Sequence, residues 1–412
     1  MQVRHAALFL LAMALCTLSI ASAQETSQPP TIQPGQLRQI PQSEIHNILS
    51  SRVSLGREGD APINAATPTL PLFPYTDGGF NGTIVGTAPT TPVSTTVPTV
   101  IVPVVLNITQ NGATFTFDPR ATDPGCLGGS NTALSLTQSS PIFTSTTSPI
   151  VLNGVSEGNT QYIDAFQRAE FATTVAPAHH TLLSGSVGAP LTVSLNEASA
   201  GTPAAVFSVS GVCGTNPGPV NTAGTLGIVN ANVLNPLLQS YISANGINAS
   251  QFVLFVLYNT TMSAGAANNL NNCCILGFHM GLGGSVQNPG QTYGIADFEG
   301  RDQTVFGGVS DTSVLVHEVG EWANDPSGVN STPAWGNIGQ VSGCQGNLEV
   351  GDPLSGTLAP AITQAGFTFH LQELAFFSWF YHDSPSQGAG GKYSSNGTFS
   401  GFAKACPPGG TN

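Results

Sequence analysis

The pattern of hydrophobic and polar positions predicts strands in the first half of the chain. Residues 99–119 alternate β-branched and polar residues around an Asn-Gly pair, which is typical of a β-hairpin. Residues 188–213 alternate in the same way, and apolar residues at helical spacing predict a helix over residues 159–175. We therefore expect a β-rich region over residues 99–223. A Pro-, Thr- and Ser-rich leader that is partly disordered, residues 24–98, precedes it.

From residue 224 onward the pattern predicts helices and strands in a definite order. Residues 227–246 place apolar side chains at helical spacing and end at Gly246, a typical helix C-cap residue. Three strand patterns follow, then a helix around His317 and a last helix; apart from the His317 helix, these segments are residues 251–259, 273–281, 291–300 and 369–381. This order predicts a second region, residues 224–412, and an α+β fold class.

Residues 1–23 have the pattern of a secretory signal peptide. Arg4 and His5 precede an apolar run over residues 6–20, and the small residues Ala-Ser-Ala at 21–23 supply a cleavage site. The run is short for a bilayer span, and no second apolar segment of about 20 residues follows it. We therefore expect an exported protein, secreted or periplasmic, without a membrane anchor.

Composition narrows the partners that the chain can bind. Only 8% of the residues are charged, and the formal net charge is −13. An acidic chain is poorly suited to bind nucleic acid, whose phosphates attract basic surfaces, so no nucleic-acid partner is expected. Low charge together with many Gly and Pro residues suits an extracellular protein that is stabilised by turns and disulfides.

Six cysteines remain after the signal peptide, enough for three disulfides in an exported chain. Proximity along the chain suggests how four of these cysteines pair in two disulfides. These are Cys126 with Cys213 and Cys344 with Cys406. The adjacent Cys273 and Cys274 form either a vicinal disulfide or bonds to separate partners.

One segment combines helical spacing with the chemistry of a metal site. Residues 311–326 read DTSVLVHEVGEWANDP, so His317 and Glu321 stand one helical turn apart, with β-carbons about 5–6 Å from each other. Both side chains can then reach one ion, and Glu318 takes the position of the general base in zinc hydrolases. Neighbouring buried carboxylates repel and lose hydration, which a divalent metal offsets. The alternative is a solvated helix face with an ordinary His317–Glu321 pair.

Acidic residues after this helix are candidates for a third metal ligand. Glu349 is our first choice and Asp352 our second, whereas Asp325, the last candidate, is expected to cap the helix or to lie behind the ligands and orient His317. The alternative for Glu349 and Asp352 is a turn with exposed acids. His279 follows a strand pattern and can face the site, although a structural hydrogen bond is its favoured role.

The motifs resemble those of known exported proteins. The His-Glu-x-x-Glu at 317–321, Asp-Pro at 325–326, Trp335 and the Glu-x-x-Asp at 349–352 look like secreted bacterial relatives of the plant phosphate-induced, exordium-like proteins. More distantly, they are similar to the zincin metallopeptidases. The zincin resemblance implies a mixed sheet with an active-site helix, here preceded by the β-rich N-terminal region. The chain departs from zincins at Glu321, where they carry a second histidine.

The leading interpretation is an exported zinc-dependent hydrolase, a peptidase acting on an extracellular peptide or protein. His317, Glu321 and Glu349 would hold Zn²⁺, and Glu318 would activate water as the general base. The strand at residues 291–300 would be the sheet edge along which an extended substrate pairs.

The alternative interpretation is a non-catalytic extracellular or cell-wall module with a structural ion. Oxygen ligands from Glu321, Asp325, Glu349 and Asp352 would suit Ca²⁺ better than Zn²⁺. The metal that the purified protein contains separates the two interpretations.

Overall fold

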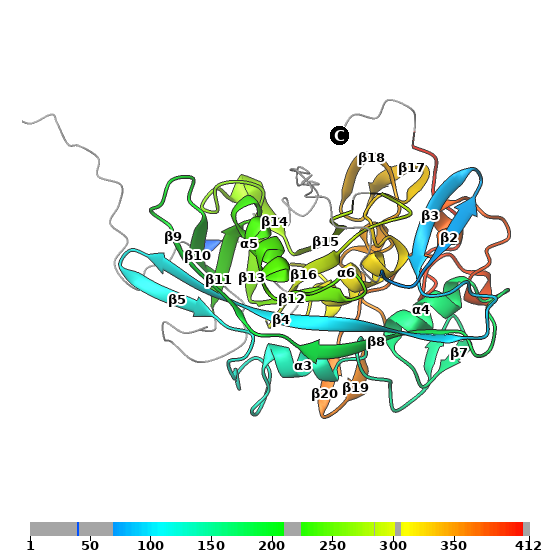
Figure 1. Cartoon of the computed structure of the whole chain (residues 1–412), viewed down its shortest axis with the longest axis horizontal. Helices are drawn as coiled ribbons and strands as arrows, with labels where there is room; N and C mark the ends of the chain where they lie inside the picture. Colours follow the sequence, from blue (N-terminus) through cyan, green and yellow to red (C-terminus); the bar gives the residue numbers. More distant parts are fainter. Residues whose placement is uncertain (1–38, 41–68, 210–223, 284, 301–305, 407–412) are drawn as a thin grey trace, which may run out of the picture. The chain divides into compact units, whose positions relative to one another are not determined.

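Two β-sheets organise the described part of the chain, which in this computed structural model comprises residues 39–40, 69–209, 224–283, 285–300 and 306–406 (Figure 1). All of these residues belong to the compact unit Leu37–Asn412. The expected α+β class is confirmed, with more strand than helix. The expected signal peptide, residues 1–23, lies outside the described residues.

The larger sheet is built around β12 (Phe252–Tyr258), a strand whose residues are all buried. Its strands are β4 (Ser94–Gln110), β5 (Ala113–Phe117), β8 (His180–Val187), β9 (Leu191–Asn196), β12, β15 (Gly277–Gly281) and β16 (Thr292–Phe298). The order is β15-β16-β12-β4-β5, and β8 and β9 also pair with β4. β12 has parallel neighbours on both sides, which explains its unbroken apolar sequence. β15 pairs antiparallel with β16 and forms one edge.

β4 continues through the expected boundary at residue 98 and joins both expected regions in one sheet. Its first half pairs with β8 and β12, and its second half pairs with β5 and β9. β4 and β5 confirm the hairpin predicted over residues 99–119. Strands also occur within the expected leader, among them the pair β2 (Leu72–Asp77) and β3 (Phe80–Val85). Richness in Pro, Ser and Thr therefore does not mark where the folded part begins.

The smaller sheet likewise joins strands from before and after the expected boundary at residue 223. Its order is β1 (Gln39–Ile40), β10 (Ala204–Val209), β11 (Thr225–Asn230), β13 (Thr260–Ser263) and β14 (Cys273–Ile275). β11 shortens the helix predicted over residues 227–246, because Ile228 and Val229 pair with β10 and β13. Helix α5 (Ala231–Ala244) begins only after Asn230, whose side chain caps it.

Helix α6 (Ser313–Asn324) confirms the helix predicted around His317 and packs against β15 and β16. Trp322 fixes it there: its ring stacks on Phe252 with centroids 3.9 Å apart, and its Nε1 donates to Thr292 Oγ1 at 3.0 Å. Every residue of α6 is buried, including His317 and its two glutamates. The alternative of a solvated polar face is therefore wrong.

The helix predicted over residues 369–381 is mostly absent. Only α7 (Phe377–Phe380) is helical, and the segment starts in β20 (Phe367–Phe369), which pairs with β19 (Ile362–Gln364). Its aromatic residues are buried in the core, and the backbone N–H groups of Ala375 and Phe376 bond to distant carbonyls. Tertiary packing therefore overrides the helical spacing, and the extended stretch runs beside α6.

Two disulfides join described cysteines. β17 (Ser331–Ile338) and β18 (Val341–Asn347) form a hairpin, and the predicted disulfide Cys344–Cys406 is present, with Cα atoms 5.9 Å apart. Cys273 and Cys274 are bonded to each other, which decides between their two alternatives. Cys213 lies outside the described residues, so its bond to Cys126 stays a prediction.

Short elements complete the described structure. Helix α4 (Tyr162–Glu170) confirms, in shortened form, the helix predicted over residues 159–175, and β8 lies against it. The others are α3 (Ala133–Ser139), β6 (Ile150–Leu152), β7 (Val155–Gly158) and the 3-10 turns η1 (Leu270–Asn272), η2 (Asp352–Leu354) and η3 (Ala389–Gly391). Within the described ranges, no helix is long and apolar enough to cross a bilayer.

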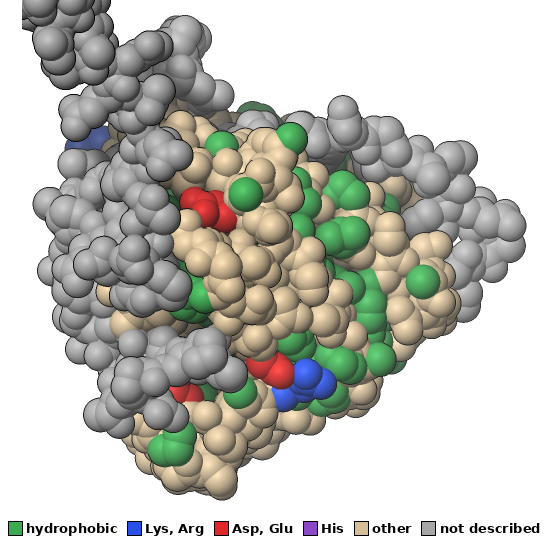
Figure 2. All heavy atoms as spheres, turned by 90° about the vertical axis from the view of Figure 1, so that its left-hand side faces the viewer, with side chains coloured by type: hydrophobic (Ala, Val, Ile, Leu, Met, Phe, Trp, Pro, Cys, Tyr) green, Lys and Arg blue, Asp and Glu red, His purple; other side chains and the backbone are tan. Residues whose placement is uncertain are grey.

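Few charged side chains appear on the face at the β5 and β9 end of the larger sheet, as Figure 2 shows for the described residues. This agrees with the low content of charged residues. The acids of α6, by contrast, are buried. The candidate site residues of α6 therefore lie inside the fold, where neighbouring residues determine their positions.

Glu170, at the end of α4, provides a test of buried charge. It is 1% exposed, and neither carboxyl oxygen has a hydrogen-bond partner among the described residues. Burial raises the pKa of Glu170 well above its usual value, and the nearby backbone of Phe377 offsets this only in part. The folded chain thus keeps Glu170 neutral, while the unfolded chain ionises it above about pH 4.3, so folding loses stability as the pH rises.

We expect Glu170→Gln to raise the melting temperature at pH 7 and to have little effect near pH 3, where the acid is mostly neutral in both states. Thermal unfolding across this pH range measures the difference. Asp118→Asn, which breaks a surface pair with the half-exposed Arg120, is the control and should change stability by only about 0–1 kcal/mol. Equal effects of Glu170→Gln at both pH values would contradict the prediction.

Candidate metal centre

Two histidines and three acids from separate segments meet beside α6. The helix supplies His317 and Glu321, which lie one turn apart on the same face, and the adjacent Glu318. β15 supplies His279, and η2 supplies Asp352. Their ligand atoms form two groups, each within 4.8 Å, and Glu321 belongs to both.

The first group joins His317, Glu321 and Asp352. His317 Nε2 lies 3.1 Å from Glu321 Oε1 and 3.5 Å from Asp352 Oδ1. All three residues are at least nine-tenths buried. The spacing predicted for the helix therefore brings His317 and Glu321 together, and the loop after β18 adds one acid.

Gln372 fixes which nitrogen of His317 faces the acids. Its Nε2 donates to the carbonyl of Gly351 at 2.8 Å, so its Oε1 is the atom that lies 3.1 Å from His317 Nδ1. An amide oxygen only accepts, so Nδ1 carries a proton and neutral His317 presents a lone pair at Nε2. A hydrogen bond of this kind on the second nitrogen is the usual support of a metal-binding histidine.

The acids of the first group are held by hydrogen bonds. Glu321 Oε1 accepts from the backbone N–H groups of Gly351 and Asp352 at 3.1 and 3.3 Å. Asp352 accepts from Gln340 at Oδ1 and from Gln345 at Oδ2, the latter at 3.2 Å. These donors hold each carboxylate in one orientation, which preorganises the group.

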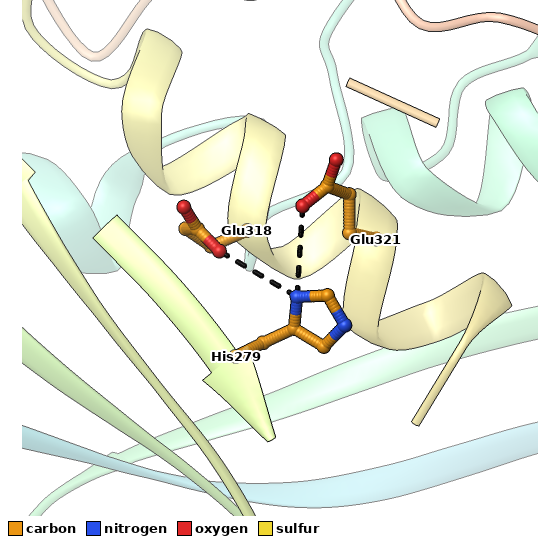
Figure 3. Close-up of side chains that lie close together, drawn as sticks. All are labelled: His279, Glu318 and Glu321. Carbon is orange, nitrogen blue, oxygen red and sulfur yellow. Dashed lines mark ion pairs between the residues drawn. The ribbon is translucent and has the colours of Figure 1, made fainter. Parts of the chain in front are cut away.

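The second group joins His279, Glu318 and Glu321 (Figure 3). His279 Nδ1 lies 3.6 Å from Glu318 Oε2 and 3.6 Å from Glu321 Oε2. His279 Nε2 lies 3.1 Å from the carbonyl oxygen of Asp325, which can only accept. Neutral His279 therefore carries its proton at Nε2 and presents the lone pair of Nδ1 to the two glutamates.

Burial and mutual attraction shift the pKa values of these groups in opposite directions. Burial alone lowers the pKa of His279 and His317, but the neighbouring carboxylates raise both well above their usual value. Burial raises the pKa of Glu321, yet the two histidines bring it well below its usual value. Burial raises the pKa of Glu318, and the histidines offset this only in part. Glu321 is therefore the carboxylate that carries its negative charge most firmly.

Glu349, our first choice for the third ligand, lies outside both groups. It is half-buried, and the side chain of Asn347 donates to its Oε1. Burial raises the pKa of Glu349 well above its usual value, and the charges of Glu321 and Asp352 raise it further. Asp352, three residues after Glu349, takes the place expected for Glu349 because η2 turns its carboxylate toward His317.

Asp325 is the C-cap residue of α6, which is one of the two roles expected for it. Its carboxylate accepts from Ser327 Oγ at 3.0 Å and from the backbone N–H groups of Val329 and Asn330 at 3.0 and 2.8 Å. Burial raises its pKa to about 6 despite these donors and His279. The carboxylate shapes the turn after α6, and the residue orients His279 through its backbone carbonyl rather than orienting His317.

The residues fit a divalent metal ion. Tetrahedral ligands about 2.0–2.1 Å from zinc lie about 3.3–3.4 Å from one another, close to the 3.1–3.6 Å separations between the paired atoms here. Glu318 Oε2 is buried and has no hydrogen-bond partner among the described residues. Metal ions bound here would be ligated by this oxygen and by His279 Nδ1 and His317 Nε2, the two ring nitrogens that otherwise face carboxylates.

His279 forms a structural hydrogen bond, its favoured role, with the carbonyl of Asp325, and it also faces the two glutamates. The signal available was its place at the end of a strand pattern shortly before the motif helix. Only the antiparallel pairing of β15 with β16, over which α6 packs, brings it to the glutamates. Comparisons with protein-family models, with curated proteins and with solved structures find no match for this chain.

We expect Gly351→Ala to weaken zinc binding about 10- to 100-fold, as loss of groups that orient a ligand typically does. A Cβ atom at Gly351 would lie 2.5 Å from His317 Nδ1, so the ring must move away from Gln372. Competition with a chromogenic chelator measures the affinity. Gly346→Ala is the matched control, since the nearest atom to its Cβ would be 3.5 Å away; equal affinities in both variants would contradict the prediction.

Proposed function

We propose that the chain is an exported zinc-dependent hydrolase of zincin-like architecture that cleaves peptide bonds. The observation that carries this proposal is the position of His317, whose Nδ1 lies beside Gln372 Oε1 and whose Nε2 lies 3.1 Å from Glu321 Oε1 and 3.5 Å from Asp352 Oδ1. The sequence order of strands and motif helix supports the zincin likeness. Export is supported by the signal-peptide pattern and by the disulfide Cys344–Cys406.

His317, Glu321 and Asp352 would hold the zinc ion. Bound there, zinc supplies Lewis-acid polarisation of a carbonyl and lowers the pKa of a water molecule. Glu318 follows His317 directly and belongs to the adjoining ligand group, so it is the carboxylate that can take the proton of that water. A Cβ at residue 277 would lie 2.5 Å from Glu318 Oε1, so Gly277 leaves the space that Glu318 needs.

The edge of the larger sheet supports an extended peptide as substrate. β16, the strand at residues 291–300 expected to form this edge, is hydrogen-bonded on both sides, by β12 and β15. The edge strand is instead β15, which pairs only with β16 among the described strands and carries His279. A peptide added along β15 would place its backbone beside the α6 acids.

Zinc suits this site better than calcium. The calcium interpretation needs oxygen ligands from Glu321, Asp325, Glu349 and Asp352 in one shell. The carboxylate of Asp325 is engaged in the turn after α6, and Glu349 belongs to neither ligand group. Each group includes an imidazole nitrogen, which zinc prefers and calcium does not.

We expect Glu318→Gln to lower peptide cleavage about 10²- to 10⁴-fold, because the amide cannot accept the proton of the attacking water. At least one zinc equivalent should remain, since His317, Glu321 and Asp352 are unchanged. Cleavage of a broad peptide library and metal analysis of the same sample give both values. Loss of activity together with all bound zinc would show that Glu318 acts as a ligand of the primary ion instead.

We expect Asp352→Asn to release the zinc of the His317 group, whereas Glu349→Gln should retain it. The two acids are three positions apart, yet only Asp352 shares a group with His317. Elemental analysis after dialysis against a weak chelator tests the pair. If Glu349→Gln loses zinc and Asp352→Asn keeps it, the original ligand choice is right and the geometry proposed above is wrong.

A further inference from the structure

We infer that the centre binds two divalent cations, with Glu321 as the bridging carboxylate. The second ion would lie between His279 Nδ1, Glu318 Oε2 and Glu321 Oε2. This inference deepens the proposed function and rests on its metal site around His317. A pair of cations is a different catalyst from a single zinc ion, because it can hold both the attacking and the leaving oxygen.

The distances at His279 are those of a shared ion rather than of hydrogen bonds. A charged imidazole bonded to a carboxylate lies about 2.7–2.9 Å from it. His279 Nδ1 is instead 3.6 Å from both Glu318 Oε2 and Glu321 Oε2. That separation is near the spacing of about 3.3–3.4 Å between two ligands of one tetrahedral ion.

Glu318 supplies an independent observation. The residue is 4% exposed, and its Oε2 faces His279 without a hydrogen-bond partner among the described residues. A buried carboxylate oxygen in this state is costly unless a cation or a donor satisfies it. Because a carboxylate has two oxygens, ligation through Oε2 leaves Oε1 to accept a proton from water.

Glu321 is oriented as a bridge. Its Oε1 faces His317 Nε2 at 3.1 Å, and its Oε2 faces His279 Nδ1 at 3.6 Å. Both histidines have their remaining nitrogen bonded to an oxygen that only accepts, so each would present a lone pair to an ion in its neutral, metal-binding form. Glu321 lies between the two histidines, so each of its carboxylate oxygens faces one ligand group.

Charge also favours two ions. Glu318, Glu321, Glu349 and Asp352 carry four negative charges when ionised, and the two histidines are neutral when they act as ligands. No lysine or arginine of the described ranges forms an ion pair with these four acids. One divalent ion leaves two charges uncompensated in a buried site, whereas two divalent ions neutralise all four.

Loading the full-length mature protein with Mn²⁺ tests the inference without any measurement of activity. We expect about two equivalents to bind, and electron paramagnetic resonance to show exchange coupling between them, since coupling requires a shared ligand. His279→Ala should bind one equivalent with an uncoupled spectrum. His180→Ala, which removes a half-exposed histidine paired with Asp164 outside the site, should behave like the wild type.

The possible failures are distinct. One equivalent and no coupling in the wild type, with His279→Ala unchanged and His317→Ala empty, overturns the second ion and leaves the proposed single-zinc site intact. Full metal binding by His317→Ala overturns the proposed function itself. If His279→Ala does not fold, as judged by circular dichroism, stepwise Mn²⁺ titration of the wild type decides: coupling that develops with the second equivalent supports the bridge, and its absence refutes it.

Discussion

Several carboxylates are buried on one side of α6. Removing them from water costs free energy, and the surrounding structure must offset this cost. Glu318 and Glu321 are almost fully enclosed, and Asp352 is brought against them from η2. Neighbouring segments each supply part of what these acids lose with water: backbone N–H groups at residues 351 and 352, glutamine side chains, and two histidines. Neutral donors satisfy individual oxygens but cancel no charge, and the proposed cations would supply that compensation.

Packing around α6 positions the acids in two ways: side chains contact the helix, and a glycine leaves space for a neighbouring segment to approach it. Trp322, stacked on Phe252, sets the distance of α6 from the larger sheet. A Cβ at residue 320 would lie 2.6 Å from Leu374 Cδ1, so Gly320 lets the extended stretch that follows β20 approach the helix. That approach brings Gln372 to His317. A continuous helix over residues 369–381 would direct these side chains elsewhere, so the failed helix prediction and the ordered histidine have one cause.

Local patterns predicted the parts of the site that local geometry determines. The four-residue spacing of His317 and Glu321 holds on any α-helix, and the buried run of β12 is recognisable from its apolar sequence. The remaining partners depend on contacts between distant segments. His279 reaches the site through strand pairing, and a tight turn decides between Glu349 and Asp352. Neither pairing nor turn geometry is encoded in residue spacing, and the expected boundaries at residues 98 and 223 fail for the same reason.

Glu321 stands where the zincin motif that the sequence resembles has a second histidine, and a carboxylate at this position differs from an imidazole in more than charge. A neutral histidine at this position would have one lone-pair nitrogen, and its other nitrogen would need an acceptor. It could face His317 or His279, but not both as a ligand. A carboxylate presents an acceptor oxygen in each direction, and its pKa is held low by the two histidines that it faces. The altered motif therefore suits a site with two neighbouring ligand groups, for which a His-Glu-x-x-His sequence would supply one donor too few.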